Sequence, residues 1–194
     1  MGANQVNGII IGLVKDLEDP ENLGRIRVTY PYLGDQQSDW ARLVTPMAGK
    51  DRGMFFRPEV GDEVLVAFEL GDVRRPYILG SLWSTEDTPP KDDGDAKKNN
   101  WRFIKSRNGH IVKLDDTQGS EKIEIIGSDG AQKIVFDIAG KKIQVTGDSG
   151  DIEVSAPSGK VKVEATTVEI KASGNMNLEA SGTMTIKGAT VNIN

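Results

Sequence analysis

Few residues of this sequence could perform chemistry, and the first candidate is His110, the one histidine in the chain. Asp115 and Asp116 follow it closely, so a base oriented by a carboxylate can be imagined. A chain with no cysteine has no thiol nucleophile, disulfide or thiolate metal site. Asn108 and Gly109 just before His110 are turn residues. We therefore interpret this segment as structural and expect no catalytic residue.

The acidic residues carry no stronger signal. Asp92, Asp93 and Asp95 resemble half of an EF-hand loop, yet Lys97 and Lys98 stand where further calcium ligands should be. Among 29 acidic residues, some pair at the separation of a glycosidase site is inevitable and carries no information. No Walker loop, Rossmann glycine motif, nucleophile elbow or His-Glu-x-x-His motif occurs. We expect no metal site, no cofactor and no enzymatic activity.

Composition divides the 194 residues into two parts. Residues 1–90 hold nine basic and fourteen acidic residues and most of the aromatic ones, whereas residues 137–194 contain no aromatic residue. Between the parts, residues 87–100 contain Pro89-Pro90 and a run of charges. Such a segment buries too little apolar surface to offset the entropy of ordering it. The expected organisation is a first domain at 1–86, a linker at 87–100 and a second domain at 101–194.

The first domain is predicted to be a small β-barrel. Five runs rich in β-branched and aromatic residues are separated by turn residues, at 6–14, 25–32, 40–45, 63–69 and 77–83. Five strands in about 80 residues fit a closed barrel of the OB type, whereas a sandwich needs about seven. The excess of acidic residues argues against the nucleic-acid binding of many OB barrels, and we expect no nucleic-acid partner.

The second domain contains a repeat. Apolar residues at positions i and i+2 recur every seven to nine residues from Ile143 and Val145 onward, with weaker copies reaching back to Ile123. Polar residues occupy the positions between them, so each unit is one strand of about five residues with a single apolar face. The inward residues expected of the later units are Ile152, Val154, Val161, Val163, Val168, Ile170, Met176, Leu178, Met184 and Ile186.

A period of about eight residues is too short for a solenoid of one chain, because a three-faced coil needs roughly 18 residues. One chain alone would leave its strand edges unpaired and its apolar face bare. Three chains wound together remove both problems. The sequence therefore predicts an all-β fold, a five-stranded OB-fold barrel followed by an intertwined trimeric triple-stranded β-helix, or β-prism needle. The competing structure is a flat antiparallel meander, whose Asn-Gly or Asp-Gly hairpin turns are available in residues 101–194 only at Asn108 and Asp129.

Several strings resemble one family. They are Asp39-Trp40-Ala41-Arg42, Pro46-Met47-Ala48-Gly49, Pro58-Glu59-Val60-Gly61-Asp62-Glu63-Val64, Arg75-Pro76-Tyr77-Ile78-Leu79-Gly80-Ser81-Leu82-Trp83, and Arg107-Asn108-Gly109-His110 with Leu114-Asp115-Asp116. They resemble the central spikes of contractile injection machines: phage baseplate assembly protein V, the spikes of extracellular contractile injection systems and the valine-glycine repeat spikes of type VI secretion. The resemblance implies an OB-fold domain and a trimeric needle, here in a short form without a hub or lysozyme domain.

The resemblance also implies a function. The protein would be a structural, non-enzymatic homotrimeric spike at the centre of the baseplate of a phage tail or phage-tail-like particle, piercing the target envelope on sheath contraction and touching the membrane only then. The implied partners are a separate hub protein at the barrel end and a tip protein with the Pro-Ala-Ala-Arg (PAAR) motif at the C-terminal end.

Two further expectations concern the ends of the chain. The residues expected to dock the tip protein are Val191, Asn192, Ile193 and Asn194, because the needle stops there in mid-repeat. The N-terminal segment lacks the features of a secretory signal, so we expect assembly in the cytoplasm. The alternative function is a carbohydrate-binding or hydrolytic phage tail protein that uses the flanks of the β-prism, and the aromatic-free stem disfavours it.

Overall fold

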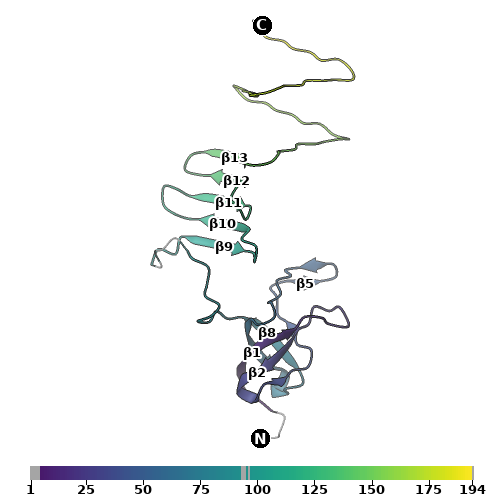
Figure 1. Ribbon diagram of the computed structural model, residues 1–194, viewed down its shortest axis with the longest axis vertical. Helices are drawn as coiled ribbons and strands as arrows, with labels where there is room; N and C mark the ends of the chain where they lie inside the picture. The colour runs from purple at the N-terminus through teal and green to yellow at the C-terminus, as the bar shows by residue number, and fades with distance from the viewer. Residues whose placement is uncertain (1–4, 93–94, 96, 194) are drawn as a thin grey trace.

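The computed structural model describes residues 5–92, 95 and 97–193, so two residues discussed above, Asp93 and Asn194, lie outside the described part. The chain is all-β, as predicted: a barrel near the N-terminus leads through an extended connection into an elongated stem (Figure 1). Helical structure in the described residues is confined to two 3-10 turns, η1 (Pro31–Leu33) and η2 (Glu69–Gly71). Nowhere in these ranges is a helix long and apolar enough to cross a membrane.

Five strands form the wall of the barrel: β1 (Ile9–Asp16), β2 (Arg27–Tyr30), β4 (Arg42–Leu43), β7 (Glu63–Phe68) and β8 (Pro76–Ser81). β1 pairs antiparallel with β2 and β7, β7 pairs antiparallel with β8, and β8 pairs parallel with β4. A bridge between Ile26 and Ala41 closes the circle. The resulting order, β1-β2-β4-β8-β7, is that of a five-stranded Greek-key barrel and confirms the predicted OB fold.

The remaining short strands decorate this wall. β3 (Gln36–Gln37) pairs with the edge of β2. β5 (Ala48–Gly49) and β6 (Arg52–Gly53) pair only with each other, in a separate hairpin between β4 and β7. The run predicted at 40–45 therefore contributes only a two-residue strand, because the chain leaves the wall there to build the hairpin.

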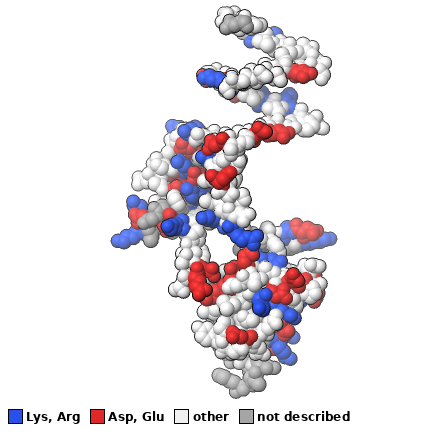
Figure 2. Space-filling model, in the orientation of Figure 1, with Lys and Arg blue, Asp and Glu red and all other residues white. Residues whose placement is uncertain are grey.

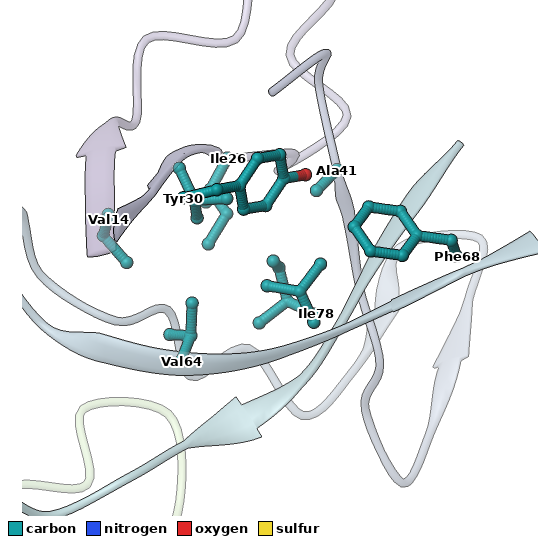
Figure 3. Close-up of a cluster of buried hydrophobic side chains, with 9 residues drawn as sticks. Val14, Ile26, Tyr30, Ala41, Val64, Phe68 and Ile78 are labelled. Atoms are coloured by element: carbon teal, nitrogen blue, oxygen red, sulfur yellow. The ribbon is translucent and has the colours of Figure 1, made fainter. Parts of the chain in front are cut away.

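Alternating residues of the wall fill the barrel (Figure 3). Nine side chains form this core: Val14, Ile26, Val28, Tyr30, Ala41, Val64, Val66, Phe68 and Ile78. The rings of Tyr30 and Phe68 meet edge to face, with centroids 5.7 Å apart. Gly12 lets β1 pass close to this core, since a Cβ there would lie 3.0 Å from Cγ2 of Val28. Small residues at such points allow the strands to close around a single layer of side chains.

A buried carboxylate fixes the loop between β1 and β2. Asp19 accepts hydrogen bonds from the backbone N–H groups of Glu21, Leu23 and Arg25 and lies 2.7 Å from the guanidinium of Arg25. The Arg25 side chain, followed by these backbone donors, holds the pKa of Asp19 well below its usual range despite burial. The loop is therefore a rigid part of the barrel.

The first part of the stem is a five-stranded antiparallel meander: β9 (Trp101–Lys105), β10 (Ile111–Asp115), β11 (Lys122–Ile126), β12 (Gln132–Asp137) and β13 (Lys142–Gly147). Each strand pairs with the next one along the chain. Gly109 and Gly130, which follow Asn108 and Asp129, have φ of 94° and 74° and turn the chain between strands. These two dipeptides are the Asn-Gly and Asp-Gly hairpin signals of residues 101–194. In this single chain, the meander that the period argument disfavoured is therefore the structure of residues 101–147.

Candidate functional site

One face of the meander is a continuous apolar surface. The register places Ile104, Val112, Ile125, Ile134 and Val145 beside one another on successive strands. A second ladder on the same face contains Leu114, Ile123, Phe136 and Ile143. All nine side chains are exposed in the single chain. A contiguous apolar face of this size marks an interaction surface.

The opposite face of the meander mixes charged residues with Trp101, Phe103, Ile111, Ile126 and Val135. Lys113 Nζ lies 2.6 Å from Glu124 Oε2 and 4.1 Å from the ring centre of Trp101. Burial raises the pKa of the neighbouring Asp115, but hydrogen bonds from Thr117 and the charge of Lys113 outweigh it, so the net shift is downward. Charges on this face pair with one another, whereas the two apolar ladders on the other face are exposed and need a partner.

Residues 148–193 continue the stem as an extended zigzag (Figure 1). Within this range no residue is assigned to a strand, so the chain supplies no neighbouring strand for the one before or after. All of the predicted inward residues are exposed: Ile152, Val154, Val161, Val163, Val168, Ile170, Met176, Leu178, Met184 and Ile186. The alternating polar positions form only local contacts, such as the ion pair of Lys171 with Glu169 at 3.1 Å. The single chain brings these apolar residues into line but does not bury them.

The predicted docking residues at the C-terminal end also face solvent. Val191 and Ile193 are exposed, Asn192 lies between them in extended chain, and Asn194 is outside the described residues. Ile143 and Val145, expected as the first pair of the intertwined repeat, lie instead on β13 and pair with β12 of the same chain.

The residues first considered for chemistry are not brought together. His110 lies in the turn before β10 and Asp115 at the far end of that strand, which separates their Cα atoms by roughly 16 Å. Asp95 instead caps a turn, accepting from the N–H of Lys97 and pairing with Lys98 Nζ at 3.2 Å. The described residues contain no group of three or more His, Asp or Glu side chains placed to hold a metal ion.

The barrel face that OB folds commonly use for ligands, at β2, β4 and the loops beside them, has balanced charge. Arginines line it, but Arg25 pairs with Asp19, Arg74 pairs with Asp72 at 2.7 Å, and Arg75 approaches Glu69 at 3.5 Å. The hydrogen bond from Arg74 lowers the pKa of Asp72 to about 2. Figure 2 shows the two signs of charge interspersed over the barrel. Arg42 instead lies over the ring of Tyr77, so three of the four arginines that line this face are paired with carboxylates.

One apolar cluster was missed by sequence reasoning. Leu23, Met47, Met54 and Phe55 line one hollow beside the β5–β6 hairpin, and Val44 and Phe56 are exposed next to it in the sequence. The string Met54-Phe55-Phe56, between charged residues and outside any run of alternating apolar residues, is the signal that could have found it.

Known proteins are similar in sequence to this chain, both in the barrel and over a longer stretch. Residues 10–83 match the family described as the type VI secretion system and phage-baseplate injector OB domain. The chain is 28% identical over 116 residues to the type VI secretion system spike protein VgrG1a of Pseudomonas aeruginosa, an alignment covering 54% of this chain and 18% of that protein. It is 30% identical over 131 residues to the spike protein VgrG3 of Vibrio cholerae, covering 61% of this chain and 13% of that protein.

A third relative differs in its named activity. The actin cross-linking toxin VgrG1 of Vibrio cholerae is 34% identical over 95 residues, covering 44% of this chain and 9% of the toxin. The chain thus spans less than a fifth of the length of each of these relatives.

Proposed function

We propose that this chain, which carries the injector OB domain of type VI secretion systems and phage baseplates and is related to type VI spike proteins, is the structural, non-enzymatic spike of a contractile injection machine. Three copies wind together over residues 148–194. The barrels lie at the base, the stem forms the piercing needle, and the assembled spike belongs to the baseplate of a phage tail or phage-tail-like particle built in the cytoplasm.

The observation that carries this proposal is the one-sided stem. Two apolar ladders on β9–β13 and the apolar pairs of residues 152–186 are all exposed in the single chain. Residues 148–193 also run extended without strand partners of their own. Two further copies would supply both the missing strand edges and the missing apolar contacts. The backbone hydrogen bonds between strands of residues 148–193 would then join different chains, which provides the stiffness that piercing requires.

Solution mass tests the proposal. We expect purified protein to elute as one species of three times 21.0 kDa by light scattering coupled to size exclusion, and to stay trimeric in mild denaturant. The reason is that the stem buries its apolar face only in the assembly. A stable folded monomer would overturn the proposed spike.

The C-terminal end is the proposed dock for a tip protein of the PAAR type. Val191 and Ile193 are exposed and lie in extended chain without strand pairing, so this segment offers apolar side chains and free backbone groups to a partner. We expect truncation after Gly188 to abolish capture of a co-expressed tip protein while the trimer persists. The matched control is Glu179→Ala, a change on the polar side of the stem that should leave capture intact. Capture by the truncated trimer would exclude Val191–Asn194 as the docking residues.

A separate hub protein at the barrel end completes the proposed assembly. Contact with the target membrane is confined to the moment of puncture, when the sheath contracts.

A further inference from the structure

Two of the strings that resemble the spike family meet where the barrel and the stem approach each other. Residues 58–62 form the turn before β7, and residues 106–110 form the turn between β9 and β10. β9 is the strand of the meander nearest the barrel (Figure 1). Arg107 Nη1 donates a hydrogen bond to Glu59 Oε2 at 3.0 Å, so a hydrogen-bonded ion pair joins the two turns. The pair connects residues 48 positions apart in the sequence.

The turn that carries Glu59 is fixed to the barrel wall. The Glu59 N–H donates to Asp62 Oδ2 at 2.8 Å, and the Asp62 N–H donates to the Glu59 carbonyl at 3.2 Å. Val14 of β1 holds the same turn, since its N–H donates to the Asp62 carbonyl and its carbonyl accepts from the Gly61 N–H, each at 2.9 Å. Because Val14 belongs to the core, the barrel sets the position of Glu59.

The turn that carries Arg107 is fixed to the meander in a similar way. Ser106 closes this turn, since its N–H donates to the His110 carbonyl and its carbonyl accepts from the Gly109 N–H, each at 2.9 Å. Ser106 Oγ also accepts a hydrogen bond from the His110 N–H at 3.0 Å. Both partners of the ion pair therefore lie on turns whose shape is held by their own part of the chain.

The connection between barrel and stem adds little to this contact. Within residues 82–100, no residue that the structure describes belongs to a strand or helix, and none is buried. The ion pair itself is exposed, with the Arg107 side chain 76% and the Glu59 side chain 57% accessible. An exposed ion pair shifts an equilibrium by only about two- to five-fold, and salt weakens it. The contact between the two parts is therefore present but weak.

We propose that the Glu59–Arg107 ion pair is a latch that docks the barrel of each chain on the first turn of its own stem, and that this latch opens readily. The docked barrel has one orientation, whereas the undocked barrel moves about the connection at residues 82–100. The latch lies within one chain, so this inference goes beyond the proposed spike and does not depend on the trimer. In the spike it would let the barrels tilt against the needle while the three stems stay intertwined.

A chain without cysteine allows the latch to be measured by cross-linking beside the ion pair. Val60→Cys with Asn108→Cys, both at exposed positions, places one thiol next to each partner and keeps the pair itself. A short bis-maleimide should join the two thiols within one chain. Mass spectrometry distinguishes this product, with one reagent per chain, from the product with two. Adding Arg107→Glu should slow cross-linking about two- to five-fold, and adding Glu59→Arg to that variant should restore the rate.

Arg102→Glu is the matched control for the charge change. Arg102 lies on β9 and pairs with Asp116 at 2.8 Å, within the stem, so breaking this exposed pair should leave the cross-linking rate unchanged. Salt supplies a second readout. Sodium chloride at about 1 M should slow cross-linking where the Glu59–Arg107 pair is intact, because it screens exposed charges, and should not slow it further in the Arg107→Glu variant.

Each outcome decides the inference. A rate that Arg107→Glu lowers and Glu59→Arg restores supports the latch. An unchanged rate in the Arg107→Glu variant overturns it, as does a low rate that the charge swap does not restore. Cross-links between chains, seen as dimers or trimers on a denaturing gel, would place the contact between subunits and also overturn it. Light scattering tests the spike separately: a trimer without the charge dependence overturns only the latch, and a monomer with it overturns only the spike.

Discussion

Replacing Ile170 by aspartate is expected to abolish the trimer. Ile170 is 71% exposed in the single chain, and the prism would place three copies of it together at the axis. Aspartate there puts three like charges in an apolar interior. A buried charge without a partner costs about 3–5 kcal/mol, and mutual repulsion adds to that cost in each trimer. Light scattering should show loss of the species of three times 21.0 kDa.

The neighbouring residue supplies the control for this variant. Lys171 follows Ile170 in extended chain, so its side chain points to the other side, and Lys171→Asp should leave the mass unchanged. A soluble trimer of the Ile170→Asp protein would show that Ile170 does not face the axis, and the inward assignment of the other pairs would fail with it.

Truncating Ile78 to alanine should unfold the barrel at markedly lower denaturant. Ile78 is fully buried at the centre of the core, where it packs among Val64, Val66 and Ile26. Buried isoleucine-to-alanine changes cost about 2–5 kcal/mol, from lost transfer free energy and the cavity left behind. Chemical unfolding followed by tryptophan fluorescence measures the loss. Leu70→Ala, at a side chain 92% exposed, should change stability by less than about 0.5 kcal/mol.

The Ile78→Ala variant also tests whether the barrel and the stem are separate domains. If residues 1–86 and 101–194 are separate domains, the Ile78→Ala protein keeps its trimeric mass while its barrel is weakened. Equal stability of the Ile78→Ala and Leu70→Ala proteins would contradict the buried position of Ile78. Loss of the trimer together with the barrel would contradict the division.

The barrel could be predicted from the sequence because its core residues alternate along each strand. Ile26, Val28 and Tyr30 on one strand and Val64, Val66 and Phe68 on another all point inward. Their spacing of two residues carries the strand periodicity directly. The β5–β6 hairpin has no such signature, since each of its strands has two residues. Its apolar residues face away from the core, so no pattern of burial along the chain reveals them.

For the stem, the sequence alone predicts only part of the structure. Apolar pairs at i and i+2 occur in both parts of the stem, but they begin about eleven residues apart from Val112 to Ile134 and seven to nine apart from Ile143 onward. Residues 101–147 find their neighbours within the chain because their connections can turn back, with Gly119 and Lys141 adopting positive φ between the later strands. Residues 148–193 have the pattern and no such neighbours. The alternation of apolar and polar residues could therefore be predicted, whereas the inward placement of the apolar residues in a trimer stays a prediction.

The change at Gly147 from paired strands to unpaired extended chain has a consequence for assembly kinetics. The contacts of β9–β13 are local in sequence, and such contacts form early and without a second molecule. The proposed needle after Gly147 consists of similar repeats, so three chains could pair with one chain shifted in register by one repeat. The five strands of the meander differ from one another in sequence, so three preformed meanders would align with one another in a single register. They would set the alignment first, so that intertwining runs as a zipper from Gly147 toward the C-terminus and slipped assemblies are avoided.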